Sequence, residues 1–188
     1  MAATYKVAVL AGDGIGPEIT QQALRVLRLI EQKRDVIFAC EEAEFGAAAY
    51  FSTGKAFPDA TKKACDEADA ILKGPIGLSY EESEKIPVEE RPERGALLPM
   101  RRRLNTYANF RPISLPKGMA HFSPLKPEIV GEGIDIMLIR ELIGGLYFGG
   151  KERGTTKEGL RYVKESLDYD EQQIRQILVV AFKESMKR

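Results

Sequence analysis

Apolar and polar segments alternate along the first part of the chain in a way that predicts strands separated by helices. Residues 5–11 form a short apolar run with β-branched members that stops at a glycine cluster, as is typical of a buried strand. Apolar side chains then recur at helical spacing between Ile19 and Ile30, behind Pro17, which suits a first helical turn. The pattern predicts, in order, a helix over 17–33, a strand over 35–40, a helix over 58–67 and a strand over 70–73. This alternation favours a parallel α/β sheet.

The pattern changes in the second part of the chain. Residues 79–94 are acidic and polar and contain two prolines, so they predict a surface loop or a mobile segment. A basic helix is expected up to about Leu104, and a final helix begins behind Asp170 and carries one apolar stripe. The strands expected between these two helices cover 107–113, 134–140 and 160–165.

Composition and charge exclude several classes of protein. The 188 residues are 44% hydrophobic and 30% charged, which is ordinary for a globular protein of one or two domains. Twenty-eight Lys and Arg balance 28 Asp and Glu, so no global field favours nucleic acid or an anionic membrane as a partner. No apolar stretch approaches the roughly 20 residues of a bilayer span, and the N-terminus lacks a signal pattern. We therefore expect a cytoplasmic protein.

Cysteine and histidine are too few for a disulfide scaffold or a zinc cluster. Only Cys40, Cys65 and His121 are present. Each cysteine is expected to be a buried, reduced thiol.

The string Gly-Asp-Gly-Ile-Gly-Pro-Glu at 12–18 lies between the first predicted strand and helix. Glycines permit a tight turn there, and a helix N-terminus can face an anion. The spacing is not Gly-x-Gly-x-x-Gly, which speaks against a Rossmann pyrophosphate site and leaves a purely structural turn open. The whole string resembles the N-terminal signature of the β-decarboxylating dehydrogenases, the family of isopropylmalate, isocitrate and tartrate dehydrogenases.

Further strings at 91–101, 108–112 and 140–149 resemble other signatures of this family, in the same order. The resemblance implies an α/β, isopropylmalate dehydrogenase-like two-domain fold with a parallel or mixed sheet and flanking helices. Residues 1–100 would form part of the first, cofactor-side domain. Residues 101–188 would form part of the second, substrate and dimerisation domain, with a β-arm at about 146–160.

The candidate substrate site is rich in arginine. A 2-hydroxy diacid needs fixed cations, and guanidinium groups bind carboxylates through two parallel hydrogen bonds. The resemblance implies that the malate carboxylates are held by Arg101, Arg111 and Arg140, and that Tyr147 is the acid/base residue of decarboxylation. From the residues alone, 101–103 would equally be a solvated basic face.

Leu97 and Leu98 occupy the positions where isopropylmalate enzymes have an apolar wall and isocitrate enzymes a polar residue. The resemblance therefore favours 3-isopropylmalate as the substrate, oxidised in leucine biosynthesis, over isocitrate or tartrate. The alternative is that both leucines pack into the core of their own part of the fold.

The resemblance also implies NAD and Mg²⁺ or Mn²⁺ as cofactors. Ile15, Gly74 and Gly77 are the candidate NAD-binding residues, although the family's Gly-Gly-Pro-Lys-Trp ending is absent after Gly74. The family's catalytic lysine, metal-binding aspartates and adenine site come from segments absent from these 188 residues, so we expect a truncated or split form that is inactive alone. It would act as a homodimer or with a complementing C-terminal polypeptide. A non-catalytic regulatory or binding subunit is the alternative.

Overall fold

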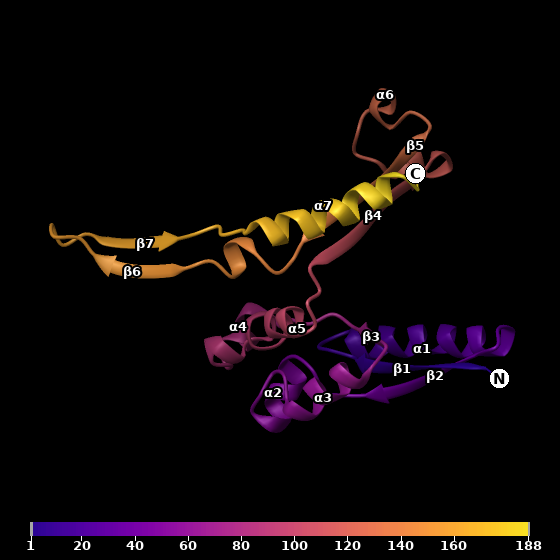
Figure 1. Cartoon of the computed structure of the whole chain (residues 1–188), viewed down its shortest axis with the longest axis horizontal. Coiled ribbons are helices and arrows are strands. Elements are labelled where there is room, and N and C mark those ends of the chain that lie inside the picture. Colours follow the sequence, from indigo (N-terminus) through magenta and orange to yellow (C-terminus); the bar gives the residue numbers. More distant parts are fainter. Residues whose placement is uncertain (1, 188) are drawn as a thin grey trace. The chain divides into compact units, whose positions relative to one another are not determined.

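The computed structural model describes residues 2–187, which divide into two compact units on either side of the Leu104–Asn105 bond (Figure 1). The first unit is α/β with a parallel sheet, so the expected fold class is confirmed. The second unit is built on antiparallel strand pairs. Within residues 2–187 no helix is both long enough and apolar enough to cross a membrane.

A three-stranded parallel sheet organises the first unit. Its elements are β1 (Ala3–Leu10), α1 (Gly16–Lys33), β2 (Val36–Glu42), α2 (Ala47–Thr53), α3 (Asp59–Glu67) and β3 (Ala70–Lys73). The strand order is β2-β1-β3, so β1 is central and its neighbours pair with it on opposite sides. The predicted strand over 70–73 and helix over 17–33 are confirmed, whereas α2 was not predicted.

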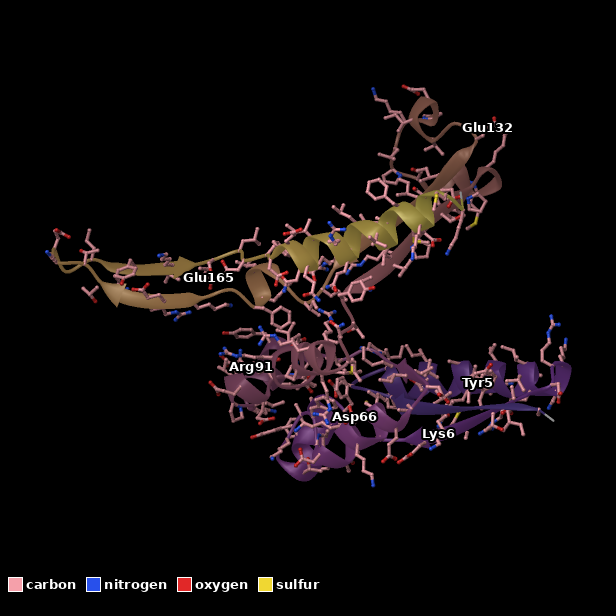
Figure 2. The ribbon with its side chains drawn as sticks, viewed as in Figure 1. Tyr5, Lys6, Asp66, Arg91, Glu132 and Glu165 are labelled. Atoms are coloured by element: carbon pink, nitrogen blue, oxygen red, sulfur yellow. The ribbon has the colours of Figure 1, made fainter. Side chains whose placement is uncertain are left out.

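The core of this unit lies around the carboxyl half of β1. Val7 to Leu10 are buried, while Tyr5 and Lys6, labelled in Figure 2, belong to the exposed amino-terminal half. Leu10 packs in a cluster with Phe45 and Phe57, whose rings meet edge to face with centroids 5.3 Å apart. The aromatic pair therefore joins the segments before α2 and α3 to the central strand.

The segment after β3 is more ordered than the predicted loop over 79–94. It forms α4 (Tyr80–Ser83), a 3-10 turn (Val88–Glu90), a π-turn (Pro92–Leu97) and α5 (Leu98–Arg103). The loop prediction was wrong because Ser79 and Glu82 form a capping box that starts α4. In the π-turn the Leu98 N–H donates to the Glu93 carbonyl, one residue beyond α-helical spacing.

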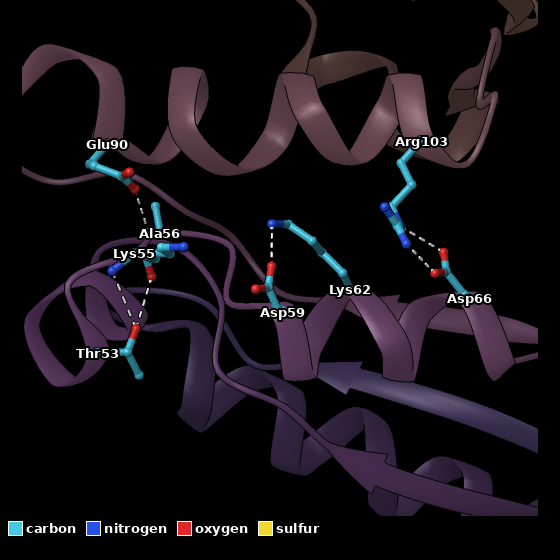
Figure 3. Close-up of polar contacts among 8 residues, drawn as sticks. All are labelled: Thr53, Lys55, Ala56, Asp59, Lys62, Asp66, Glu90 and Arg103. Atoms are coloured by element: carbon cyan, nitrogen blue, oxygen red, sulfur yellow. Dashed lines mark hydrogen bonds and ion pairs between the residues drawn. The ribbon is translucent and has the colours of Figure 1, made fainter.

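Two contacts fasten this segment to the rest of the unit (Figure 3). The Arg103 guanidinium on α5 pairs with the Asp66 carboxylate on α3, with Nε 2.8 Å from Oδ1. The Glu90 carboxylate accepts a hydrogen bond of 2.9 Å from the Ala56 N–H, between α2 and α3. Both ends of the π-turn and α5 segment are therefore held in place.

The second unit consists of two antiparallel strand pairs and a long helix. Its elements are β4 (Ala108–Pro116), a 3-10 helix (Lys117–Phe122), α6 (Pro127–Val130), β5 (Gly133–Glu141), a 3-10 turn (Gly145–Tyr147), β6 (Lys151–Thr155), β7 (Arg161–Glu165) and α7 (Glu171–Ser185). Asp170 caps α7 in a capping box with Gln173, as the sequence predicts. Strand β6 was not predicted. It pairs with β7, which ends at Glu165 (Figure 2), and the β6–β7 hairpin covers residues 151–165, whereas the β-arm was expected at about 146–160.

The two cysteines differ in environment. Cys65 is buried in the core cluster as expected, but Cys40, on the edge strand β2, is exposed. Burial raises the pKa of the Cys65 thiol. Partial desolvation, together with the nearby Glu31 carboxylate, raises the pKa of the Cys40 thiol. Both groups are therefore thiols rather than thiolates at neutral pH.

We expect iodoacetamide to label Cys40 in the folded chain and Cys65 only after the first unit unfolds. The labelling rate of Cys40 should rise with pH beyond the ordinary thiol pKa, because a raised pKa postpones formation of the reactive thiolate. Peptide mass spectrometry across a urea series measures both sites, with the Cys65→Ser variant as the control for assignment. Rapid labelling of Cys65 without denaturant would contradict the packing described.

Candidate functional site

The carboxyl ends of β1 and β3 form the first candidate region. The chain leaves β1 toward β2 on one side and returns through β3 on the other, which makes this end of the sheet a topological switch point. Open α/β sheets bind ligands in the crevice at such a point. Two loops meet there, because the Asp13 N–H donates to the Pro75 carbonyl at 2.9 Å and the Gly74 N–H donates to the Leu10 carbonyl at 2.8 Å.

Glycine allows these two loops to pack backbone against backbone. Gly12 has φ +79°, and a Cβ added there would lie 2.0 Å from the Pro75 carbonyl oxygen. A Cβ on Gly74 would lie 2.0 Å from the Ala11 carbonyl oxygen. Gly14, with φ +56°, faces open space. The glycines of the 12–18 string therefore serve mainly to bring two backbones together.

The buried carboxylate of Asp13 connects three segments at this end of the sheet. Oδ1 accepts a hydrogen bond of 2.9 Å from the Ala48 N–H in the first turn of α2, and Oδ2 accepts one of 3.0 Å from the Gly77 N–H. Gly46 precedes α2 and has no side chain, so Asp13 supplies the acceptor that an N-cap side chain would provide. Sequence reasoning did not single out Asp13, because these partners are distant along the chain.

The predicted cofactor-binding residues lie in these two loops. Ile15 is 61% exposed, and the Gly77 N–H is held by Asp13. A Cβ added to Gly77 would lie 3.2 Å from a carboxylate oxygen of Glu93, so the π-turn borders the same loop. Gly12 also lines a cavity of about 260 Å³, together with Val9, Ala11, Pro17, residues 42–45 and Ala48.

Two cationic side chains, Arg101 and Lys73, lie near this region. The Lys73 ammonium group donates a hydrogen bond of 2.6 Å to the Gly74 carbonyl. Burial lowers the pKa of Lys73, the charge of Arg101 lowers it further, and the Asp13 carboxylate partly opposes the shift. Arg101 therefore lies within electrostatic range of the switch-point loops, and Lys73 is a cation that sequence reasoning missed.

The two leucines predicted to contact substrate lie where the π-turn passes into α5. Leu97 is half-buried and packs against the core cluster that contains Phe45 and Phe57. Leu98 is half-buried and does not belong to that cluster. The core-packing alternative therefore describes Leu97, while Leu98 has a partly accessible apolar side chain.

The other two predicted arginines lie on one face of the β4–β5 pair. Asn109 lies directly opposite Arg140 in the antiparallel register, and Arg111 lies opposite Leu138. Directly opposite residues share a face, as do residues two apart on one strand. The Arg111 Nε–H donates a hydrogen bond of 2.6 Å to Asn109 Oδ1. Neither arginine has a carboxylate partner among residues 2–187.

Arg140 and Tyr147 line the same cavity in the second unit. This cavity has a volume of about 470 Å³, and its walls also include Leu138, Leu146, Leu167 and Tyr169. Tyr147 is 58% exposed and ends the 3-10 turn. The Glu141 carboxylate accepts hydrogen bonds of 2.9 Å from both Ile143 and Gly144 N–H groups, which fixes the backbone leading into that turn.

The structure thus divides the predicted substrate residues between the units. Arg101 and the two leucines belong to the first unit, and Arg111, Arg140 and Tyr147 belong to the second. In the part of the chain that the structure describes, no three His, Cys, Asp or Glu side chains lie close enough to hold a metal ion. The residues present do not fit the Mg²⁺ or Mn²⁺ that the resemblance implies, and no chemical step is assigned to a metal.

The chain is similar to known proteins in both sequence and structure. The family model described as isocitrate/isopropylmalate dehydrogenase matches residues 6–188. The 3-isopropylmalate dehydrogenase of Campylobacter jejuni is 42% identical over 184 residues, which cover 98% of this chain and 49% of that protein. The 3-isopropylmalate dehydrogenase of Geobacter sulfurreducens is 44% identical over 189 residues, which cover 100% of this chain and 51% of that protein.

Solved structures show the same fold. Isocitrate dehydrogenase from Methylococcus capsulatus aligns with a TM-score of 0.75 at 24% identity, over 97% of this chain and 48% of that one. A β-decarboxylating dehydrogenase from Thermococcus kodakarensis aligns with a TM-score of 0.65 at 24% identity, over 98% of this chain and 46% of that chain. The chain spans about half the length of the relatives it matches.

We expect Gly12→Ala to destabilise the first unit far more than Gly14→Ala. Both residues have positive φ, so an alanine in this left-handed conformation costs about 1–2 kcal/mol of stability at either position. Only at residue 12 would the methyl group also meet the Pro75 carbonyl, which should raise the loss to about 3 kcal/mol or more. Urea unfolding followed by circular dichroism measures both variants, and equal losses would show that the two loops do not pack closely.

Proposed function

Because this chain belongs to the isocitrate/isopropylmalate dehydrogenase family, we propose that it supplies the substrate-binding part of a 3-isopropylmalate dehydrogenase. Such an enzyme oxidises 3-isopropylmalate with NAD and releases CO₂. The observation that carries the proposal is the shared face of Arg111 and Arg140, two guanidinium groups without a carboxylate partner among residues 2–187, beside a cavity that contains Tyr147. Two fixed cations suit a substrate with two carboxylates.

In this proposal the arginines bind and orient the diacid. Arg101, Arg111 and Arg140 are the proposed ligands of the malate carboxylates. The arginines would hold the diacid while its C2–H bond breaks as hydride and its hydroxyl proton is released, a chemistry for which NAD would supply the electron acceptor. The C3–carboxylate bond then breaks, CO₂ leaves, and the electron pair stays on the enolate. In this proposal the Tyr147 hydroxyl returns a proton to C3.

The switch-point loops are the proposed contact with NAD. Their position at the carboxyl ends of parallel strands fits the place where α/β sheets bind nucleotides, and the exposed Ile15 side chain offers an apolar surface. Gly77 lies in the same region, with its N–H oriented by Asp13, and Gly74 packs its loop against β1. NAD, when bound, accepts the hydride.

The substrate preference is proposed from the leucines. Leu98 offers an apolar, partly accessible side chain of the kind that an isopropyl group would contact, while Leu97 anchors the same turn to the core. A polar residue at either position would leave that contact unfavourable. We accordingly favour 3-isopropylmalate over isocitrate or tartrate, and place the reaction in leucine biosynthesis in the cytoplasm.

A second polypeptide segment completes the enzyme in this proposal. The relatives are about twice as long as the part that the chain matches, and the catalytic lysine, metal ligands and adenine site are proposed to come from that remaining part. We propose a complementing C-terminal polypeptide as the source of these groups, and a homodimer as the alternative assembly of the chain. A non-catalytic binding subunit is the competing proposal, and it retains diacid binding without turnover.

Calorimetric titration with 3-isopropylmalate tests the site itself. We expect binding by the unmodified chain and at least tenfold weaker binding by Arg111→Ala or Arg140→Ala, because each variant loses a charge-assisted contact. Arg161→Ala, on the exposed strand β7, is the matched control and should bind normally. Undiminished binding by Arg111→Ala would remove the carboxylate assignment.

Complementation tests the catalytic part of the proposal. Co-expression with the C-terminal half of the Geobacter sulfurreducens relative should restore NADH formation from 3-isopropylmalate when Mg²⁺ or Mn²⁺ is added, and the chain alone should form none. In the restored enzyme, Tyr147→Phe should lower kcat by about 10²-fold or more, with little change in KM. Turnover by the isolated chain would show that the proposed division of catalytic groups is wrong. Binding without turnover in every combination would favour the binding subunit.

A further inference from the structure

Asn109 is a neighbour of both proposed substrate arginines on the face of the β4–β5 pair. It is directly opposite Arg140 across the β4–β5 pair and two residues before Arg111 on its own strand. All three side chains therefore project from one face, and opposite Cβ atoms in such a pair are about 4.5–5.5 Å apart. Asn109 is half-buried, whereas Arg111 is exposed.

The orientation of the Asn109 amide follows from the chemistry of its neighbour. The Arg111 Nε–H donates to Asn109 Oδ1 at 2.6 Å, and a guanidinium group has no acceptor. The amide oxygen must therefore be the atom that faces Arg111, which leaves the amide NH₂ as a donor directed elsewhere. With Nε engaged, the remaining N–H groups of Arg111 are free to meet a carboxylate as a fork.

We infer that Asn109 is a positioning residue of the diacid site, which fixes the Arg111 guanidinium and adds its own NH₂ to the donors facing the substrate. The inference rests on the proposed function for its ligand, a dicarboxylate. Arg111, Asn109 and Arg140 together form a donor row, defined by these three residues. Its order is cation, neutral donor, cation.

A neutral amide suits the middle of this row better than a carboxylate. An aspartate has the same shape and could also accept from Arg111 Nε, but its charge would neutralise one arginine and repel the incoming diacid. An alanine would leave the charges unchanged and release Arg111 to rotate. The two substitutions therefore separate the positioning of Arg111 from the charge of the row.

The hydrogen bond itself can be observed without any ligand. In the ¹⁵N spectrum of the arginine side chains, the Arg111 Nε–H should exchange slowly in the unmodified chain and at least tenfold faster in Asn109→Ala. Ser114→Ala, on the same strand but the opposite face, is the matched control and should leave that exchange unchanged. Equal exchange in the unmodified chain and Asn109→Ala would overturn the positioning role.

Calorimetry with 3-isopropylmalate, and with the monocarboxylate 2-hydroxyisocaproate, tests the role in the site. Asn109→Ala should weaken 3-isopropylmalate binding about tenfold, and Asn109→Asp should weaken it more strongly. In both variants, binding of the diacid should weaken more than binding of the monoacid. A general loss of folding would weaken both equally. Normal diacid binding by Asn109→Asp would overturn the donor row.

Failure of the inference and failure of the proposed function give different results. If the unmodified chain binds no 3-isopropylmalate, the proposed function and the ligand of the donor row are both overturned, while slow Arg111 Nε exchange would still confirm the Asn109 contact. If the chain binds 3-isopropylmalate but Asn109→Ala and Asn109→Asp bind it equally well, the proposed function stands and the inference is overturned.

Discussion

The buried carboxylate of Asp13 is the interaction on which the first unit's candidate site depends. Its two oxygens accept backbone N–H groups from α2 and from the loop after β3, and its own N–H binds that same loop. A buried carboxylate is costly unless it is hydrogen-bonded, so these contacts constrain each other. Because Gly12 and Gly46 have no side chain, the Pro75 carbonyl approaches residue 12 and the Asp13 carboxylate approaches residue 46 at distances that a Cβ would prevent. The switch-point crevice is thus shaped by backbone packing around one acid.

The second unit reaches its candidate site by a different physical route. Strand periodicity, rather than a buried ion, places Arg111 and Arg140 on one face, since residues two apart and residues directly opposite share a side of the pair. The Glu141 carboxylate then fixes the backbone that leads to Tyr147. The two units therefore organise their candidate residues by separate means.

The sequence predicted those elements whose signals are local. The strand over 70–73 and the Asp170 cap depend on neighbouring residues, and the strands containing Arg111 and Arg140 have clear apolar patterns. Helix α2 escaped prediction because its cap comes from Asp13, 35 residues earlier, and β6 escaped because its sequence is polar throughout. The family motifs identified the candidate arginines and tyrosine. The neighbouring residues Asn109, Glu141 and Lys73 could be identified only from the strand register and the contacts in the structure.

The π-turn at Pro92–Leu97 has a consequence for how related sequences are aligned. Such a turn is equivalent to one residue inserted into an α-helix, and each residue rotates a helix by about 100°. Glu90 fastens one side of the turn and Arg103 the other, so the insertion sets the angular position of Leu98 and Arg101 around the helix. A homologue with one residue fewer here would keep the same residues in its motif, but their side chains would point to a different side of the helix. The position of an alignment gap within residues 92–97 therefore determines which side chains are taken to share a direction.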